Sequence, residues 1–265
     1  MKVWAITTIA NEESIIGYTL SHLFSQGIDG VIVGLHNSTD MTEHIVMEMK
    51  DRGRNITIIR LDFAAFYQSR MVTELANLAH SYGADWVLPF DADELFYSED
   101  KSLSLTDAIR RTLHSVIGVP LINHYATDRD VVSPNPFIAH PWRHVDLNPL
   151  AKMIVRFDPS MTIDNGNHRI LRGEDPMRAE AEAISVRHFT AIDADRWVVK
   201  TIANATALEA GADIPEGVGA HVRLYKKHAD VAGRDALKAF YYQHFFFPLP
   251  NNKMVYDPAP YTGEL

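Results

Sequence analysis

Apolar runs alternate with amphipathic stretches along the first hundred residues. Short runs rich in Val, Ile and Leu have the length of buried strands. They lie at 3–9, 31–35, 56–61 and 86–88. Between them, apolar side chains recur three or four positions apart, which predicts helices. These stretches run from about 14 to 24, around 45 to 53 and from about 68 to 82. This alternation is typical of parallel strands joined by right-handed crossovers.

The pattern is less regular after residue 102. A helix around 105–113 and a helix from 193 to 211 are predicted from apolar spacing. Further strands are predicted at 116–122, 152–157 and 183–189. Residues 123–150 are crowded with Pro, His, Asp and Asn, so we interpret them as a long functional or mobile loop. We therefore predict an α/β fold, with a doubly wound, mostly parallel sheet flanked by helices and a helical C-terminal annex.

Polar residues follow each of the first four predicted strands. In parallel sheets, ligands bind beyond the carboxyl ends of the strands, so these turns should meet at one edge. They carry Asn11 and Glu12, then Asn37 and Asp40, then Asp62, then Asp91 and Asp93. Any one of these turns is more simply explained as a helix cap. Four consecutive turns with an acidic excess indicate a binding site instead.

The fourth turn places Asp91, Asp93 and Glu94 within four residues. Carboxylates this close repel one another and raise each other's pKa unless a cation lies between them. A divalent metal with oxygen ligands, Mn²⁺ or Mg²⁺, is a natural candidate. The chain contains neither Gly-x-Gly-x-x-Gly after its first strand nor a Gly-x-x-x-x-Gly-Lys-Ser/Thr loop. A bound nucleotide would then need another anchor for its phosphates, and this metal could provide it.

Composition limits the classes of partner. The 265 residues carry a formal net charge of -9, which argues against nucleic acid because its binding relies on clustered Lys and Arg. There is no Cys, which excludes disulfides and Cys nucleophiles and fits a reducing compartment. No stretch has the length of a transmembrane helix, so a cytoplasmic protein is expected, with contact at a membrane surface still open. Oligomeric state is not predicted.

Several of these motifs together resemble the family 2-like glycosyltransferases of the GT-A type, which carry an Asp-x-Asp motif. The similarity covers residues 1–100 well and extends more loosely to Lys200. The motifs are Asn11-Glu12-Glu13, Asn37-Ser38-Thr39-Asp40, Arg70 before a helix, and the stretch from Asp85 to Glu94. The resemblance implies that 1–100 is the nucleotide-sugar-binding half of one GT-A-like domain, that 101–210 binds the acceptor and completes the metal site, and that 211–265 is a helical, aromatic extension.

The resemblance also implies roles for individual residues. Donor-binding residues would be Asn11, Glu12, Asn37, Asp40, Asp62, Arg70, Lys152 and Lys200. Metal ligands would be Asp91, Asp93 and His188, with His168 as the alternative. The catalytic base is ambiguous, because Glu174-Asp175 is followed at once by Pro176 and does not open a helix. Asp175, Asp164 and Glu174 all remain candidates, while Glu94 is expected to have a supporting role.

The implied activity is transfer of a sugar, as from a UDP-sugar, to the hydroxyl of a saccharide or other acceptor, with inversion at the anomeric carbon. Three alternatives remain open. They are a non-catalytic nucleotide-sugar-binding protein, a nucleotidyltransferase, and a phosphatase with an Asp nucleophile, although the last usually places its acidic turn after the first strand. The aromatic stretch 234–247 is expected to pack on its own domain, with a dimer contact, a membrane surface or a lid as alternatives.

Overall fold

Four parallel strands form the N-terminal half of the sheet. The computed structural model describes residues 1–264, and its order in this half is β3-β2-β1-β4. The strands are β1 (Val3–Ile9), β2 (Gly30–Leu35), β3 (Ile56–Arg60) and β4 (Trp86–Pro89), all in parallel register with their neighbours. The four predicted strands and their parallel pairing are therefore confirmed.

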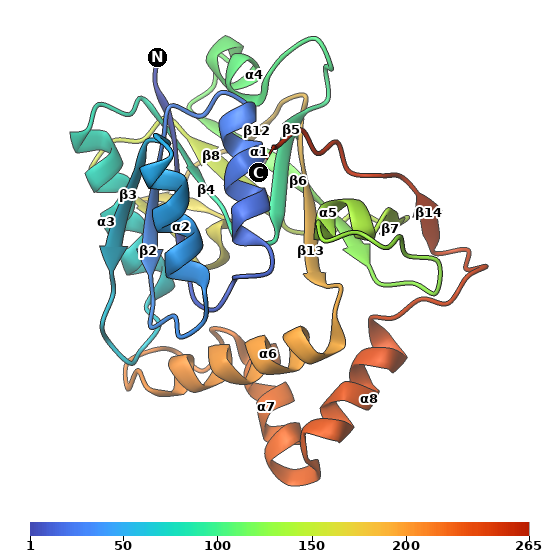
Figure 1. Ribbon diagram of the computed structural model, residues 1–265. Coiled ribbons are helices and arrows are strands. Elements are labelled where there is room, and N and C mark those ends of the chain that lie inside the picture. The colour runs from blue at the N-terminus through green and yellow to red at the C-terminus, as the bar shows by residue number, and fades with distance from the viewer. Residues whose placement is uncertain (265) are drawn as a thin grey trace.

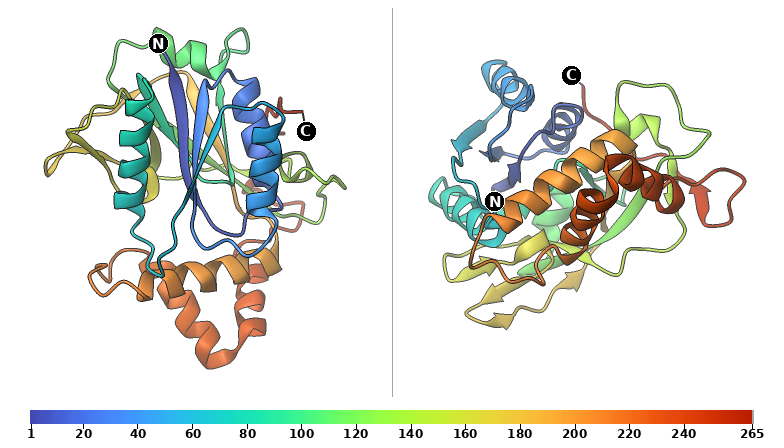
Figure 2. Two further views of the ribbon diagram at one scale, coloured as in Figure 1. Left: turned by 60° about the vertical axis from the view of Figure 1, so that its left-hand side comes forward. Right: turned by 90° about the horizontal axis from the view of Figure 1, so that it is seen from below.

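Helices cover both faces of these strands (Figures 1 and 2). Side chains alternate along β1, so that Val3 and Ala5 enter one apolar cluster while Trp4 and Ile6 enter another. The first cluster is completed by α1 (Ile16–Ser25), α2 (Thr42–Asp51) and α4 (Leu105–Arg111), and the second by α3 (Gln68–Ser81). A core on each face is what a doubly wound sheet requires, and the predicted fold class is confirmed.

The second half of the sheet mixes directions. Strand β8 (Ala151–Val155) runs antiparallel between β4 and β6 (Val116–Tyr125). Strand β13 (Ile184–Ala191) pairs in parallel with β6 and antiparallel with β5 (Glu94–Ser98). Its register places His188 opposite Glu94, at the start of β5. The predicted strand that ends near residue 189 therefore returns directly to the turn that carries Asp91, Asp93 and Glu94. We refer to this turn as the acidic turn.

Residues 123–150 contain more regular structure than the predicted loop. Strand β6 continues to Tyr125, followed by α5 (Pro136–Ala139) and β7 (Trp142–His144). His124 is fully buried, stacks on Phe189 at 4.4 Å between ring centroids, and its Nδ1 lies 2.8 Å from the carbonyl oxygen of His140. His124 is thus a core residue although its side chain is polar. For this reason the apolar pattern of the sequence does not show that β6 continues to Tyr125.

A small second sheet lies beside α3. It contains β9 (Met161–Ile163), β10 (Ile170–Arg172) and β11 (Asp175–Pro176), with the short helix η1 (Asn165–Asn167) between β9 and β10. Ser69 of α3 donates a 2.6 Å hydrogen bond to the carbonyl of Ile163. The short strand β12 (Glu180–Ala181) then pairs with β6 and leads the chain back to β13.

Three helices lie across the carboxyl edge of the parallel strands (Figures 1 and 2). They are α6 (Ala194–Glu209), α7 (Ala220–Ala232) and α8 (Arg234–His244). Trp197 of α6 and Leu237 and Tyr241 of α8 are buried together in a third apolar cluster. The aromatic stretch therefore packs on its own chain, as predicted. We refer to α6, α7 and α8 as the annex.

The chain ends as a strap along the sheet and α1. Strand β14 (Met254–Tyr256) pairs with β7, and the strap then reaches His22 of α1. The Nε2 atom of His22 lies 2.8 Å from the carbonyl oxygen of Phe96, and the N–H of Thr262 donates to Nδ1 at 3.2 Å. Tyr261 stacks on the imidazole. This arrangement needs a neutral ring, and burial lowers the pKa of His22 to about 4.

The neutral His22 predicts a pH-dependent stability. The unfolded chain takes up a proton near pH 6.5 that the folded chain takes up only near pH 4. Folding stability is therefore lost as pH falls from 6.5, by about 1.4 kcal/mol per pH unit and about 3 kcal/mol in total. Urea unfolding between pH 7 and 4.5 should show a smaller decline for His22→Gln than for the natural protein. The exposed His44→Gln is the control, and equal declines in all three proteins would contradict the assignment.

Candidate functional site

A cavity of about 1220 Å³ opens at the carboxyl edge of the sheet and is covered by the annex. Its lining comes from many separate parts of the chain. These include Asn11 and Glu12 after β1, His36 and Asn37 after β2, Asp91 and Asp93 after β4, His188 of β13, and Lys200 of α6. The predicted meeting of the four turns at this edge is thus confirmed, with Ala64 and Phe66 from the turn after β3, although Asp40 and Asp62 do not line this cavity.

The turns after β1 and β2 are built by asparagines in the left-handed region. Asn11 has a φ of 56° and Asn37 a φ of 53°, values that Asn accepts more readily than most residues. The side chain of Asn11 accepts a 2.8 Å hydrogen bond from the N–H of Thr39, and Asn37 donates one of 2.8 Å to the carbonyl of Phe63. Both side chains therefore hold their turns together while the turns line the cavity.

The acidic turn is neutralised from behind by Lys152 of β8. Its Nζ lies 2.6 Å from Oδ2 of Asp91 and 2.8 Å from Oε1 of Glu94. The second oxygen of Glu94 accepts a 3.0 Å hydrogen bond from the N–H of Asp91. Glu94 is fully buried, and burial raises its pKa to about 8. Burial also acts against the charge of Lys152, but Asp91 and Glu94 outweigh it and raise the pKa of the ammonium.

Asp93 is neutralised from the annex. Nζ of Lys200 lies 2.6 Å from Oδ2 of Asp93 and 2.8 Å from Oε1 of Glu12. Arg196, one helical turn earlier, forms an ion pair with the other oxygen of Glu12. Asp93 is 2% exposed, and although burial acts to raise its pKa, the Lys200 ammonium outweighs it and lowers that pKa. These pairs fasten α6 to the turns after β1 and β4.

His188 faces the same carboxylate as a neutral ring. Its Nδ1 lies 3.0 Å from Oδ1 of Asn123, which accepts the N–H, and its Nε2 lies 3.9 Å from Oδ1 of Asp93. Burial lowers the pKa of His188 to about 4. The lone pair on Nε2 is therefore directed toward the acidic turn, as a metal ligand or hydrogen-bond acceptor requires.

Asp164 and His168 lie on another wall of the cavity. Asp164 accepts a hydrogen bond of 2.8 Å from the N–H of Asn165 and forms an ion pair with Arg169. Nδ1 of His168 lies 2.8 Å from the carbonyl oxygen of Ala151. Burial lowers the pKa of His168. Of the three predicted bases, Asp164 is the one at the cavity.

The other predicted site residues lie elsewhere. Asp62, Arg70, Glu174 and Asp175 are exposed and line neither this cavity nor the smaller one described below. Asp40 accepts hydrogen bonds from the N–H groups of Glu13 and Thr42 and lines the smaller cavity. Glu174 lies in the β10–β11 turn and Asp175 begins β11, where the small sheet faces solvent.

The carboxylates as arranged do not fit the predicted metal site. Within residues 1–264 no group of three or more His, Asp or Glu side chains is arranged to hold a metal ion. The Oδ2 atoms of Asp91 and Asp93 are instead paired with the ammonium groups of Lys152 and Lys200, so these carboxylates already carry counter-charges. Crowded carboxylates do need a cation, and here lysines from β8 and α6 provide it.

Arg196 and Asn123 have contacts in the site that the sequence analysis did not assign. Arg196 pairs with Glu12, and Asn123 sets the orientation of His188. The spacing of four between Arg196 and Lys200 places both on one helix face, a signal that was available in the sequence. Nothing in the sequence around Asn123 marks it, because its role depends on the register of β6 against β13.

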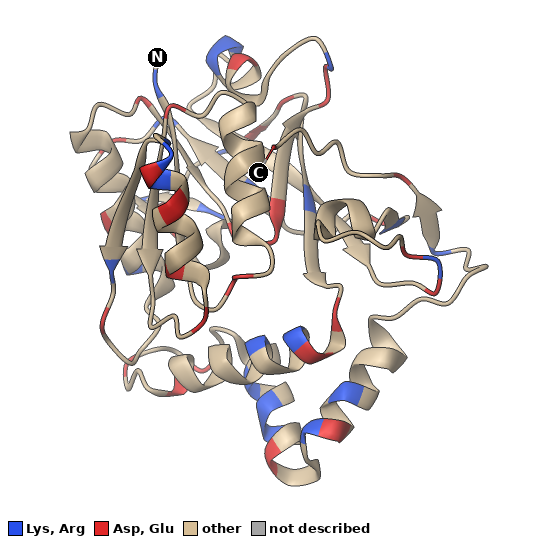
Figure 3. Cartoon of the chain, viewed as in Figure 1, with Lys and Arg blue, Asp and Glu red and all other residues tan. Residues whose placement is uncertain are grey.

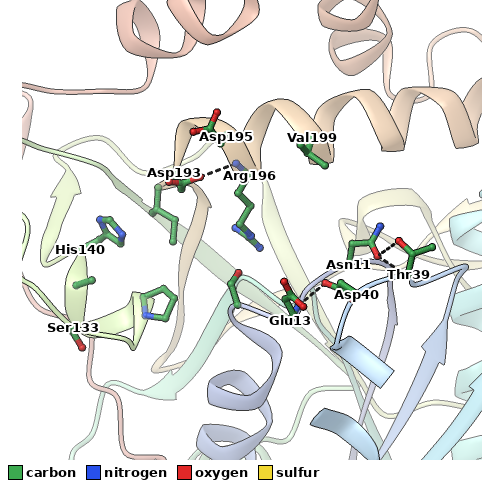
Figure 4. A pocket seen from close by; sticks show the side chains of 14 residues that line it. Asn11, Glu13, Thr39, Asp40, Ser133, His140, Asp193, Asp195, Arg196 and Val199 are labelled. Carbon is green, nitrogen blue, oxygen red and sulfur yellow. Dashed lines mark hydrogen bonds between the residues drawn. The ribbon is translucent and has the colours of Figure 1, made fainter. Parts of the chain in front are cut away.

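A second cavity of about 610 Å³ adjoins the first, since Asn11 lines both. Figure 4 shows Arg196 of α6 extending between Asp193 and the turns that carry Glu13 and Asp40. Ser133, Pro136 and His140 contribute the opposite wall. Carboxylates outnumber cationic groups in this lining, so it is better suited to a hydroxyl-bearing ligand than to an anion.

No helix within residues 1–264 combines the length and apolar character that crossing a bilayer requires. No family model and no curated protein matches the sequence. Among solved structures, the chain is similar to Staphylococcus aureus TarS 1-349 in complex with UDP, at 15% identity and a TM-score of 0.40, over 88% of this chain and 72% of that one.

Two further solved structures show the same level of similarity. The mannosyltransferase PcManGT from Pyrobaculum calidifontis, in complex with GDP-Man and Mn²⁺, has 15% identity and a TM-score of 0.40 over 91% of this chain and 74% of that one. A 4-diphosphocytidyl-2C-methyl-D-erythritol synthase from Anaerococcus prevotii has 14% identity and a TM-score of 0.33, over 85% and 82%. Similarity at this level does not establish an activity for the chain.

Substitution of Lys152 in its buried pair with Glu94 should cause a large loss of stability. A second substitution, at Glu94, should restore part of that stability. Lys152→Met leaves Asp91 without its partner and Glu94 without a counter-charge in a dry environment. We expect a loss of about 3–5 kcal/mol in the free energy of unfolding, measured in urea at pH 9, above the pKa of about 8 at which Glu94 ionises in the natural protein. Adding Glu94→Gln should recover part of that loss, because a neutral side chain costs less to bury.

The control for that experiment is an exposed pair of the same kind. Arg52 and Glu48 lie 2.5 Å apart on the surface of α2. Arg52→Met should cost less than about 0.5 kcal/mol because water screens the pair. Additive effects of Lys152→Met and Glu94→Gln would show that the two side chains do not share a charge interaction.

Proposed function

We propose that the chain is a glycosyltransferase that takes a sugar from a nucleoside diphosphate sugar, such as a UDP-sugar, and moves it to an acceptor hydroxyl. One observation carries this proposal: the turns after the four parallel strands, with the carboxylates of Asp91 and Asp93, and Lys200 of α6 line one large cavity. The cavity exceeds the typical size range of small-molecule sites and accommodates a nucleotide together with a sugar.

The lining residues support separate positions along the cavity for the nucleoside, the diphosphate and the sugar of the donor. The turns carrying Asn11 and Asn37 offer backbone and amide groups beside the ends of β1 and β2, where a nucleoside fits. The diphosphate is placed next to Lys200, which lines the cavity and is the cation closest to Asp93. The sugar is then directed toward the wall formed by Asp164 and His168.

The proposed transfer exchanges one bond for another at the anomeric carbon. The acceptor oxygen forms a bond to that carbon while the bond to the diphosphate oxygen breaks, and its electron pair stays on the departing diphosphate. A carboxylate receives the acceptor proton, and Asp164 is our choice because of its position. Attack from the opposite side inverts the anomeric configuration. Cations near the leaving group stabilise the charge that develops on it.

The smaller cavity offers a place for the part of an extended acceptor that lies away from the reacting hydroxyl. It joins the larger cavity at Asn11 and carries Glu13, Asp193 and Asp195 on its walls. Its acidic character disfavours anionic acceptors and supports a neutral, hydroxyl-rich acceptor such as a saccharide. We keep the cytoplasm as the proposed location, because the chain has no Cys.

A non-catalytic nucleotide-sugar-binding protein is the second candidate. The observation in its favour is that Asp164 is tied to Arg169 and to the N–H of Asn165, which leaves its oxygens partly occupied. Such a protein would bind the donor without consuming it. Turnover therefore separates the two candidates.

Nucleotide binding is the first prediction from this proposal. UDP or GDP at 100 times its dissociation constant should stabilise the protein by about 2.7 kcal/mol, which raises the melting temperature by several degrees. Thermal shift with UDP, GDP and ADP, each with EDTA or with Mn²⁺, measures this effect. If none of the three raises the melting temperature in either condition, the proposed function is wrong.

The position of Asp164 yields a second prediction. Slow hydrolysis of the bound sugar nucleotide uses water in place of the acceptor, and the same carboxylate would take the proton. Asp164→Asn should lower kcat by about 100-fold or more, which is the usual contribution of a general base. Glu174→Gln and Asp175→Asn should leave kcat within about two-fold, since both side chains are exposed and line neither cavity.

Arg169→Gln is the control for the salt bridge. It breaks the ion pair with Asp164 while leaving the carboxylate in place. If Arg169→Gln lowers kcat as much as Asp164→Asn, the pair has a structural role and the base lies elsewhere. Absence of any hydrolysis in the natural protein, together with nucleotide binding, would favour the non-catalytic candidate.

A further inference from the structure

The charges of the acidic turn are balanced by the protein's own side chains. Three carboxylates contact three cations in two groups. In one group Lys152 contacts Asp91, and in the other Arg196 and Lys200 contact Glu12, with Lys200 also on Asp93. Glu94 is the remaining carboxyl group, and it is fully buried beside Lys152. The usual reason to expect a divalent ion, an excess of unpaired negative charge, therefore does not hold here.

The two lysines occupy different positions relative to the cavity. The side chain of Lys152 is 3% exposed and lies behind Asp91, whereas that of Lys200 is 26% exposed and lines the cavity. An ammonium group has three N–H donors. Lys200 uses two of them on Glu12 and Asp93, so one donor remains for a ligand.

A divalent ion would compete directly with these contacts. To bind Asp91 and Asp93 it would approach two carboxylates whose Oδ2 atoms already lie 2.6 Å from ammonium groups. Two ammonium groups on the same carboxylates repel a divalent ion, so the lysines would have to move away before it bound at full strength. Lys152 has little room to do so, because its side chain is buried between β4 and β6.

We infer that Lys200 supplies the positive charge that holds the diphosphate of the donor, and that the donor therefore binds without a divalent ion. This inference rests on the proposed function, because it concerns the phosphate end of the same cavity. Lys152 acts as a positioning residue that keeps Asp91 neutralised from behind. Arg196 holds Glu12 from the same helix face as Lys200, so that Glu12 remains neutralised when Lys200 also contacts phosphate.

The test compares nucleotide binding with and without metal. Titration calorimetry of the full chain with UDP and with GDP is carried out in EDTA and then in Mn²⁺. The dissociation constant of the natural protein should differ by less than about three-fold between the two conditions. Binding that occurs only with Mn²⁺ overturns this inference and leaves the proposed function standing. Binding in neither condition overturns both.

Substitution of Lys200 sharpens the test. Lys200→Gln should weaken binding in EDTA by about 10- to 100-fold, the usual effect of losing one charged hydrogen bond. It also frees Asp93 from its partner, so Mn²⁺ should now restore at least half of the lost affinity, measured on the logarithmic scale. A purely structural role of Lys200 would not create a metal requirement. Lys200→Arg, which keeps the charge, should stay within about five-fold of the natural protein in EDTA.

The matched control is Lys226→Gln on α7. Lys226 forms ion pairs with Glu209 and Asp230 within the annex and lines neither cavity. Its substitution should leave the dissociation constant and its lack of metal dependence unchanged. If Lys200→Gln and Lys226→Gln have the same effect on binding in EDTA, Lys200 does not hold the diphosphate. The measurement on the natural protein decides the central point even if a variant fails to fold.

Discussion

The pairing of buried lysines with the carboxylates of the acidic turn is the constraint on which the site depends. Asp93 and Glu94 are almost fully buried, and ionised carboxylates in such surroundings are strongly destabilising without a partner. The partners come from two separate elements. Lys152 approaches from β8 and Lys200 from α6. The acidic turn is therefore formed correctly only when the antiparallel strand and the annex are both in place.

This dependence ties the annex to the sheet by charge as well as by apolar contact. Trp197 of α6 is buried in the annex core, while Arg196 and Lys200, on the neighbouring face of the same helix, bind the turns after β1 and β4. A helix held at two turns lies over part of the cavity. Lys200 lines the cavity, so a ligand can reach its ion pairs. A diphosphate bound to Lys200 would then also help to hold α6 in place.

The limits of prediction from the sequence follow from the same contacts. The parallel half of the sheet was predictable because each strand and helix has its own local apolar pattern. Crowding of Asp91, Asp93 and Glu94 led to the prediction of Mn²⁺ or Mg²⁺, whereas the cations in contact with these carboxylates are lysines. These lysines are 61 and 107 residues away from the carboxylates they contact, so only the folded register reveals them. For the same reason His124 was misread as part of a loop, since its burial depends on stacking against β13.

The distribution of charge over the molecule, like the local contacts, favours binding of an anion near Lys200. A net charge of -9 would repel an anionic nucleotide if it were spread evenly. The annex helices depart from that average, because they carry seven Lys or Arg against four Asp or Glu (Figure 3). Helix α6 and the first residues of α7 line the cavity, so part of this positive excess lies beside it. An anion is therefore attracted toward the annex. There it can bind Lys200, the cation of α6 that lines the cavity and has one N–H donor not used by Glu12 or Asp93.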